Sequence, residues 1–369
     1  MTEITDKLNL PCGVQIKNRI CKGAMTEGLA DEQNRATSKH VNLYDRWSSG
    51  GAGILLTGNV QVDHRYLERP GNVVIEGKQT NEQLSRLTSY ADAGTKNNTH
   101  LWMQISHAGR QTPASVAEIP VAPSDVQLQM PGAQFGKPRP LTHEEILDII
   151  QRFSHCARIA KDTGFTGVQI HGAHGYLISQ FLGAKTNTRK DEWGGNLKNR
   201  SRFLIEIYRS IKENVPDSFI VGVRISPEIE KLGINLNDSI NLAGFLRDEG
   251  VDFLHLSCWD VFANSKEYPD NPRRLTEWFT QSFDDLPPII STGSVWSQSD
   301  AQELMNQGAD LIGVARVGIP YPDWAKQISQ KNYNPPRAPF TVNHLREVDL
   351  SDVFINYMKK WDGFVSNNN

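Results

Sequence analysis

Short apolar runs alternate along this chain with longer segments in which apolar residues recur every three or four positions. The short runs predict buried strands, and the periodic segments predict helices between them. Strands that are apolar on both faces indicate a parallel sheet, and eight strand–helix units predict a closed (β/α)8 TIM barrel of the α/β class. The predicted strands span residues 19–26, 53–59, 100–107, 167–172, 219–226, 253–259, 288–293 and 311–316.

Three segments lie outside this alternation. Residues 8–17 precede the first strand and predict a short N-terminal hairpin. Residues 108–140 contain six prolines, so they predict an inserted loop subdomain after the third strand rather than a helix. Residues 349–362 predict a C-terminal helix with one apolar face, made of Phe354, Tyr357, Met358 and Trp361.

This apolar face must pack on the chain's own barrel or on a second copy of the chain. A homo-oligomer is therefore one of the two possibilities. We expect the barrel to occupy residues 1–335 and the extension with its helix to occupy residues 336–369. A doubly wound open sheet is the competing fold. No G-x-G-x-x-G motif follows any predicted strand, which favours the barrel.

Composition narrows the class of protein. The formal net charge of −3 and the absence of a basic block predict no nucleic acid and no anionic membrane as partner. The N-terminus lacks a secretory signal pattern, and no apolar run approaches the ~20 residues that span a bilayer. The four cysteines form no C-x-x-C pair, so neither a disulfide framework nor a zinc site is expected. We therefore expect a cytoplasmic protein that acts on small molecules.

In a barrel of this kind the active site forms at the carboxyl ends of the strands. No predicted strand ends in a lysine, and no three carboxylates cluster there, which disfavours Schiff-base chemistry and an enolase-type magnesium site. His171 and His174 lack a third ligand nearby, so no metal is predicted. The strand ends carry instead hydrogen-bonding groups that suit a heteroaromatic ligand with several carbonyls: Thr26, Gln104, His171, His174, Tyr176 and Arg224.

The last two strands end in small residues and an arginine. Gly293 and Ser294 follow the seventh strand, and Ala315 and Arg316 follow the eighth. Barrels often bind phosphate at this place, because backbone N–H groups can approach an anion there. A phosphate at this edge and polar contacts across the mouth describe a phosphorylated ring. FMN fits that description.

Several motifs resemble those of the old yellow enzyme family of FMN-dependent ene-reductases. The matching stretches include QISHAGRQ at 104–111, FTGVQIHGAHGYLISQFL at 165–182, NTRKDEWGGNLKNRSRF at 187–203 and VGVRIS at 221–226. The resemblance covers nearly the whole chain up to about residue 330. It implies FMN as cofactor, NADH or NADPH as hydride donor and an activated alkene as substrate.

The resemblance also implies a role for each candidate residue. His171 and His174 would donate to the substrate carbonyl oxygen, and Tyr176 would protonate the α-carbon. Thr26 would hydrogen-bond the flavin carbonyl O4, and Gln104 and Arg224 would contact the pyrimidine side. The remaining cofactor contacts would come from Ala24, Met25 and Asn59 at the ring system and from Gly293, Ser294, Ala315 and Arg316 at the phosphate.

The chain departs from the family pattern at Ala24, Thr26, Trp193, Lys198 and Ala315, none of which removes a catalytic group. No cysteine follows Cys258, so the iron–sulfur cluster of the dienoyl-CoA reductase branch is not expected. Two alternatives stay open. One is a relative with different chemistry on the same flavin, namely an NAD(P)H oxidase, nitro-ester reductase or amine dehydrogenase. The other is a flavin-binding protein without catalysis.

Overall fold

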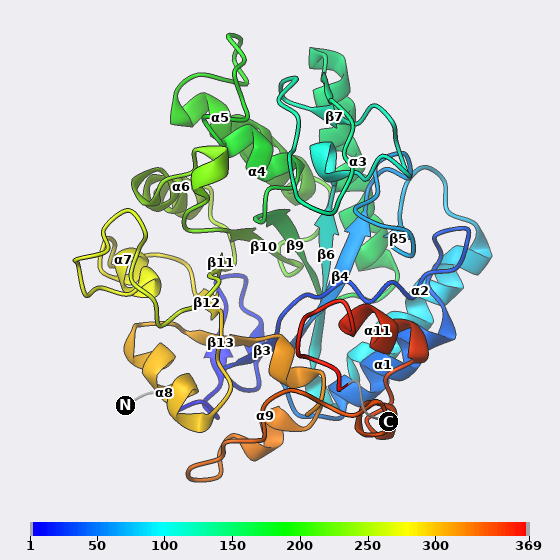
Figure 1. Ribbon diagram of the computed structural model, residues 1–369, viewed down its shortest axis with the longest axis vertical. Coiled ribbons are helices and arrows are strands. Elements are labelled where there is room, and N and C mark those ends of the chain that lie inside the picture. Colours follow the sequence, from blue (N-terminus) through cyan, green and yellow to red (C-terminus); the bar gives the residue numbers. More distant parts are fainter. Residues whose placement is uncertain (1–2, 367–369) are drawn as a thin grey trace.

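Eight parallel strands close into a barrel in the computed structural model, which describes residues 3–366 (Figure 1). The pairing of Cys21 with Gly313 joins the first strand to the last and closes the ring. The TIM barrel predicted from the apolar runs is therefore confirmed. The strands of the ring are β3 (Ile20–Lys22), β4 (Ile54–Gln61), β6 (His100–Ser106), β9 (Gly167–Gly172), β10 (Ile220–Ile225), β11 (Leu254–Ser257), β12 (Ile289–Thr292) and β13 (Leu311–Val314).

Within residues 3–366, five short strands lie outside the ring. They are β1 (Leu8–Asn9) and β2 (Gln15–Ile16), which form the predicted hairpin, β5 (Val73–Val74), which pairs with β4, and β7 (Val121–Ala122) and β8 (Arg139–Pro140), which pair within the inserted loop.

The helices surround the ring of strands, and most begin at a side chain that accepts a backbone hydrogen bond. Thr80, Thr142 and Ser297 each accept from the amide three residues further on, which caps the free N–H groups of the first turn. The α-helices are α1 (Ser38–Ser48), α2 (Asn81–Gly94), α3 (His143–Asp162), α4 (Leu177–Leu182), α5 (Leu197–Lys212), α6 (Leu236–Asp248), α7 (Leu275–Thr280), α8 (Gln298–Asn306), α9 (Trp324–Gln327), α10 (Val342–Glu347) and α11 (Asp352–Met358). The 3-10 turns in the described part of the chain are η1 (Lys96–Asn98), η2 (Gly109–Gln111), η3 (Glu230–Leu232) and η4 (Arg316–Gly318).

Some predicted boundaries were wrong. The first strand ends at Lys22 rather than at residue 26, because the chain leaves the ladder there and crosses the barrel mouth. Its apolar residues beyond that point signal burial, and Ala24 is buried without pairing. The pattern also missed α4 and α10, which are six residues each and too short to show a helical period.

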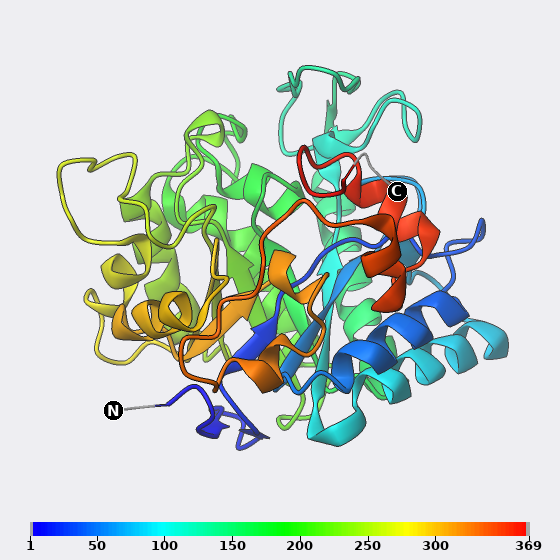
Figure 2. The ribbon, with the colours of Figure 1, turned by 60° about the horizontal axis from the view of Figure 1, so that its bottom comes forward.

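The barrel interior is apolar at the end where the strands begin. Trp102 and Phe253 stack across it with ring centroids 4.4 Å apart. Gly222 makes this crossing possible, because a Cβ at that position would lie 2.3 Å from the Phe253 ring. The N-terminal hairpin packs Leu10 and Ile16 under the same layer. Figure 2 shows the hairpin at the end of the barrel opposite to the inserted loop and the C-terminal segment.

The C-terminal helix α11 packs on its own barrel, which is one of the two possibilities that the sequence left open. Phe354, Ile355 and Met358 are buried, and the Phe354 ring lies 6.5 Å from the Trp47 ring of α1. Trp361, expected on the same helical face, follows the end of the helix and is 42% exposed. Figure 1 shows α11 beside α1. Over residues 3–366, none of the helices combines the length and the apolar character that a membrane crossing requires.

Candidate active site

Alternation along the strands delivers polar side chains to the open mouth of the barrel. Successive residues of a strand point to opposite faces of the sheet. A residue two or four positions after an inward-facing apolar residue therefore also points into the barrel, closer to its mouth. On β10 these positions lead from Ile220 through Gly222 to Arg224, and on β9 they lead from Gln169 to His171. Arg224 pairs in register with His171, so the two side chains lie side by side at the mouth.

Arg224 provides a buried positive charge that has no carboxylate partner within residues 3–366. It is 5% exposed and donates from Nη1 to Gln104 Oε1 at 3.1 Å and from Nη2 to Ser257 Oγ at 2.9 Å. Burial lowers the pKa of Arg224 to about 10, so the guanidinium stays charged at neutral pH. Its Nε is buried without a partner, which leaves one donor for a ligand.

His171 presents a neutral imidazole. Burial first, and then the nearby His174 and Arg224, hold its pKa well below the usual range. Its Nδ1 accepts a hydrogen bond from the backbone N–H of Ala173 at 3.2 Å. Because one nitrogen of a neutral ring accepts, the other carries the proton, so Nε2–H is the available donor of His171.

His174 lies on a tight turn beyond β9. It has a φ of 61° and Gly175 has a φ of 82°, so two consecutive residues are left-handed. The turn is held by the His174 amide, which donates to Ser226 Oγ at 3.2 Å, and by the His174 carbonyl, which accepts from Gln111 Nε2 at 2.7 Å. Strained backbone of this kind is typical of functional sites, and here it brings the second imidazole back over the first.

The His174 ring is tied to the buried arginine through a serine. Its Nε2 lies 2.6 Å from Ser257 Oγ, which accepts from Arg224. His174 is exposed to the cavity, and desolvation by the surrounding barrel mouth, followed by the charge of Arg224, lowers its pKa below the usual value, so this ring is also neutral at pH 7. Since the serine hydrogen is free to donate to Nε2, the Nδ1–H of His174 becomes a second donor.

Tyr176 completes the group at the end of β9. It is the residue before α4, and its ring lies 4.9 Å from the His171 ring at an interplanar angle of 78°. The His171 and His174 rings are 5.0 Å apart. The Tyr176 hydroxyl donates to Glu68 Oε2 at 2.6 Å. The three predicted catalytic side chains thus lie together, on one turn and the strand that precedes it.

The other side of the mouth carries the amide groups that the sequence indicated. Gln104 donates from Nε2 to Asn59 Oδ1 at 2.5 Å, and the two residues are in register on β6 and β4. Thr26 lies in the segment after β3, where its Oγ1 accepts from the Asn59 amide at 3.4 Å. The hydroxyl hydrogen of Thr26 therefore stays available for a ligand.

A cavity of about 490 Å³ opens beside these groups, a volume in the range of ligand sites. Eight of the predicted residues line it, namely Ala24, Met25, His174, Arg224, Gly293, Ser294, Ala315 and Arg316. Thr26, Asn59, Gln104, His171 and Tyr176 do not line this cavity, and they lie at the adjoining part of the mouth. The predicted set is thus divided between a cavity and its rim.

The end of the cavity next to the last two strands carries arginine side chains and small residues. Gly293 packs against the carbonyl of Cys258, where an added Cβ would lie 2.6 Å from that oxygen. Arg316 donates from Nη2 to Ser294 Oγ at 3.4 Å and is otherwise exposed to solvent. Arg337 lines the same cavity and forms an ion pair with Asp300, its Nη2 lying 3.6 Å from Oδ2, so both Arg316 and Arg337 bring positive charge to this end.

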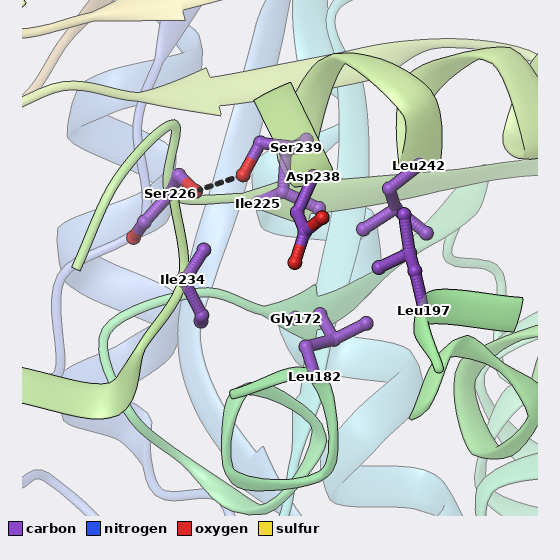
Figure 3. Close-up of a pocket in the computed structure, with 9 residues that line it drawn as sticks. All are labelled: Gly172, Leu182, Leu197, Ile225, Ser226, Ile234, Asp238, Ser239 and Leu242. Atoms are coloured by element: carbon purple, nitrogen blue, oxygen red, sulfur yellow. Dashed lines mark hydrogen bonds between the residues drawn. The ribbon is translucent and has the colours of Figure 1, made fainter. Parts of the chain in front are cut away.

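A second, much smaller cavity of about 10 Å³ lies behind the strands and is not a ligand site (Figure 3). It separates β9 and β10 from α5 and α6 and has room for about one water molecule. Ser239 Oγ donates across its edge to the Ser226 carbonyl at 3.5 Å. This contact supports Ser226, whose hydroxyl in turn holds the His174 turn.

Sequence patterns missed several residues of the mouth. Ser257 lies at a strand end and could have been found from that position. Glu68 lies in an irregular loop, and Arg337 lies beyond the barrel, so no periodic signal marks either one. Residues 361–364 also line the cavity. Among residues 3–366, the group with metal-ligand spacing is Asp63, His64 and Glu76, which contains neither His171 nor His174.

Comparison with known proteins identifies the class. A model of the NADH:flavin oxidoreductase / NADH oxidase family matches residues 11–334, and the chain belongs to this family. It is 32% identical over 339 residues to the NADH-dependent flavin oxidoreductase iliE of Hypocrea jecorina, covering 84% of each chain. It is 32% identical over 338 residues to the NADH oxidase of Thermoanaerobacter brockii, covering 89% of this chain and 51% of that protein.

Solved structures agree with this assignment. An old yellow enzyme homologue from Zymomonas mobilis superimposes with a TM-score of 0.78 at 25% identity, over 93% of this chain and 96% of that one. Morphinone reductase shares the fold with a TM-score of 0.79 at 24% identity, over 95% of both chains. The resemblance to old yellow enzymes is confirmed, and the protein is an oxidoreductase with FMN as cofactor and NADH or NADPH as electron donor.

The chemistry of the cavity and of the adjoining mouth fits FMN. The unpartnered Nε of Arg224 and the side chain of Gln104 offer polar groups where a ring system with carbonyls and ring nitrogens would lie. Arg316 and Arg337 supply positive charge at the other end, where Gly293 and Ser294 leave backbone accessible to a phosphate. FMN requires hydrogen-bonding groups for its ring system and positive charge for its phosphate, some distance apart. The barrel mouth and the cavity together provide both.

Proposed function

We propose that this protein is an FMN-dependent ene-reductase that reduces the C=C bond of an α,β-unsaturated carbonyl compound or a nitroalkene at the expense of NADH or NADPH. The observation that carries the proposal is the grouping of two neutral imidazoles and one phenol at the end of β9. Such a group supplies two fixed hydrogen-bond donors and one proton donor, which is what addition of hydrogen to an activated alkene requires.

The two imidazoles would bind the substrate oxygen. When bound, FMN supplies the hydride that reaches the β-carbon of the alkene, after receiving it from the nicotinamide. Negative charge then develops on the substrate oxygen. The Nε2–H of His171 and the Nδ1–H of His174 are fixed by their other hydrogen bonds, so they stabilise that charge as an oxyanion hole does.

Tyr176 would protonate the α-carbon. Burial, followed by the charge of Glu68, holds its pKa well above the usual range, so the phenol keeps its proton at neutral pH. An enolate formed by hydride addition is a strong base and can take that proton. The phenol therefore acts as general acid after charge has developed on the substrate.

The remaining predicted residues would hold the cofactor. Arg224 and Gln104 would bind the pyrimidine side of the flavin, where the guanidinium favours the anionic reduced form. Thr26 would donate to the flavin carbonyl O4, and Ala24, Met25 and Asn59 would contact the ring. Gly293, Ser294, Ala315 and Arg316 would bind the phosphate, a role in which Arg337 joins them.

The proposal is tested with purified protein. We expect a yellow protein whose flavin absorbance is bleached by NADH or NADPH without oxygen and is restored by 2-cyclohexenone. A protein that takes up no FMN, or a reduced flavin that no alkene reoxidises, contradicts it. Parallel assays with oxygen, nitro-esters and amines decide whether an oxidase, nitro-ester reductase or amine dehydrogenase is the better description. FMN binding without turnover on any acceptor would instead indicate a flavin-binding protein.

A further inference from the structure

Glu68 is a half-buried carboxylate at the barrel mouth that belongs to none of the roles described above. It follows β4 in an irregular loop, and its Oε2 accepts hydrogen bonds from the Tyr176 hydroxyl at 2.6 Å and from Asn59 Nδ2. Asn72 Nδ2 lies 3.4 Å from Oε1. Within residues 3–366, no arginine, lysine or histidine forms an ion pair with Glu68. A carboxylate without a cation is thus held within hydrogen-bond distance of the phenol hydroxyl.

Glu68 also lies within a continuous chain of hydrogen bonds that crosses the mouth and ends at Tyr176. Arg224 donates to Gln104, and Gln104 donates to Asn59. Asn59 donates to Glu68, which accepts from Tyr176 on the other side. The chain runs from the groups proposed to bind the flavin to the group proposed to protonate the substrate. Glu68 is the carboxylate in this chain of hydrogen bonds and the member that contacts Tyr176.

We propose that Glu68 is the positioning residue of Tyr176 and returns to it the proton that the phenol gives to the substrate. This inference rests on the proposed function. In each turnover the Tyr176 O–H bond breaks as the substrate C–H bond forms, which leaves a phenolate. The Glu68 carboxylate takes a proton from water at its exposed side and passes it to the phenolate, which restores both the Tyr176 O–H bond and the ionised carboxylate. One solvent proton is consumed per alkene, which balances the hydride.

The surroundings of the phenol make such a return necessary. The groups that act on Tyr176 electrostatically are Glu68 on the loop after β4, Tyr357 of α11 and Arg224 of β10, and His171 contacts its ring. Glu68 and Tyr357 both disfavour the phenolate, and only Arg224 favours it. A phenolate left beside an ionised Glu68 is therefore unstable, and one proton taken up from water through Glu68 leaves a single negative charge in place of two.

A purely structural role for Glu68 makes a different prediction. Glutamine has nearly the same shape and its carbonyl oxygen can still accept from the Tyr176 hydroxyl, so Glu68→Gln would then behave as the wild type. Under our proposal Glu68→Gln keeps the anchor and loses proton return. Glu68→Ala loses both. Comparison of the two variants therefore separates anchoring from proton supply.

The kinetic test measures the two half-reactions separately by stopped flow. In Glu68→Gln we expect flavin reduction by NADPH to be unchanged, and turnover with 2-cyclohexenone to slow about tenfold or more with a larger solvent isotope effect. The pH dependence of turnover should also change, because the proton donor to Tyr176 is lost. Glu228→Gln is the matched control, since Glu228 is half-buried at the same end and accepts from Ser265 Oγ without contact with Tyr176. Equal rates and pH profiles in wild type and Glu68→Gln would overturn the proposal.

A second readout needs neither flavin nor turnover. Tyrosines labelled with ¹³C at Cζ report their ionisation by NMR, and Tyr176→Phe assigns the resonance of interest. We expect Glu68→Gln to lower the pKa of Tyr176 by about one unit, because a negative charge next to the phenol is removed. An unchanged titration would show that the two groups are not coupled and would also overturn the proposal.

The outcomes distinguish this inference from the proposed function. If the reduced wild-type enzyme is reoxidised by no alkene, the proposed function is wrong and the proton return with it. If the wild type reduces alkenes and Glu68→Gln equals it, the inference about Glu68 fails and the proposed function stands.

Discussion

The guanidinium carbon of Arg69 lies 3.8 Å from the centroid of the Tyr357 ring, so the loop after β4 is joined to the C-terminal helix α11 by a cation–π contact. On its other side Arg69 packs on Gly28, where an added Cβ would lie 2.5 Å from Nη2. Arg69 is thus held between the segment after β3 and the helix α11. Its neighbour in sequence is Glu68, which accepts from Tyr176.

This contact leads to a prediction for Tyr357→Ala. Loss of the ring should destabilise the protein by about 0.5–2 kcal/mol, and the loop that carries Glu68 should lose its fixed position. Flavin reduction should be unchanged and alkene reduction should slow. Urea denaturation and stopped-flow kinetics measure the two effects. Tyr357→Phe keeps the aromatic face and should behave as the wild type, so equal defects in both variants would contradict a cation–π role.

Tyr176→Phe tests the general acid directly. The ring remains and only the hydroxyl is lost, so flavin binding and flavin reduction should stay as in the wild type. Reoxidation by 2-cyclohexenone should fall by about 10²–10⁴, the usual contribution of a general acid. A nitroalkene should be less affected, because its nitronate product is stable without a proton from the enzyme. Equal losses in both half-reactions would count against the role of Tyr176.

The positions of most mouth residues could be predicted because they depend on local pattern. His171 and Arg224 lie at the ends of uninterrupted apolar strands, and alternation along a strand fixes which face they occupy. The eight strands were found for the same reason. Strand ends were less certain, as the early exit of the chain at Lys22 shows, because apolar residues mark burial and do not by themselves mark pairing.

Other features depend on tertiary contacts that no local pattern contains. Tyr176 meets Glu68 across 108 residues of sequence, and Glu68 lies in a loop without periodicity. Docking of α11 likewise depends on the surface of α1, which offers Trp47 to Phe354. These contacts form because the closed barrel brings distant segments together. They therefore depend on the fold and cannot be read from the sequence of either segment alone.

Arg316→Ala should weaken binding of FMN and leave binding of riboflavin almost unchanged. The two ligands differ by the phosphate, and a charge-assisted hydrogen bond contributes about 1.5–3 kcal/mol, so FMN affinity should fall about 10- to 100-fold. Fluorescence titration of the FMN-free protein with both ligands measures this difference. Arg337→Ala tests the second guanidinium of the cavity in the same way. A parallel loss of riboflavin would place these side chains at the ring instead of the phosphate.

Two buried histidines that have no proposed role in catalysis or cofactor binding should make the protein less stable in mild acid. His40 and His107 are each 2% exposed, and each accepts a backbone N–H at Nδ1, from Thr37 at 3.1 Å and from Gly109 at 3.0 Å. Burial lowers the pKa of both to about 4. In the unfolded chain a histidine has a pKa of about 6.5, so below that pH the unfolded state binds more protons than the folded state.

The free energy of unfolding should therefore be highest above pH 6.5 and should decrease as the pH falls from about 6.5 to about 4, by at most about 1.4 kcal/mol per pH unit for each histidine. Below pH 4 these two groups should add no further loss. Urea unfolding of the FMN-free protein at several pH values measures the slope. His40→Gln should remove the contribution of one histidine to that slope, because glutamine does not titrate. Glutamine can still accept the backbone hydrogen bond at this position. A slope that is the same in the variant and the wild type would show that His40 is protonated in both states alike.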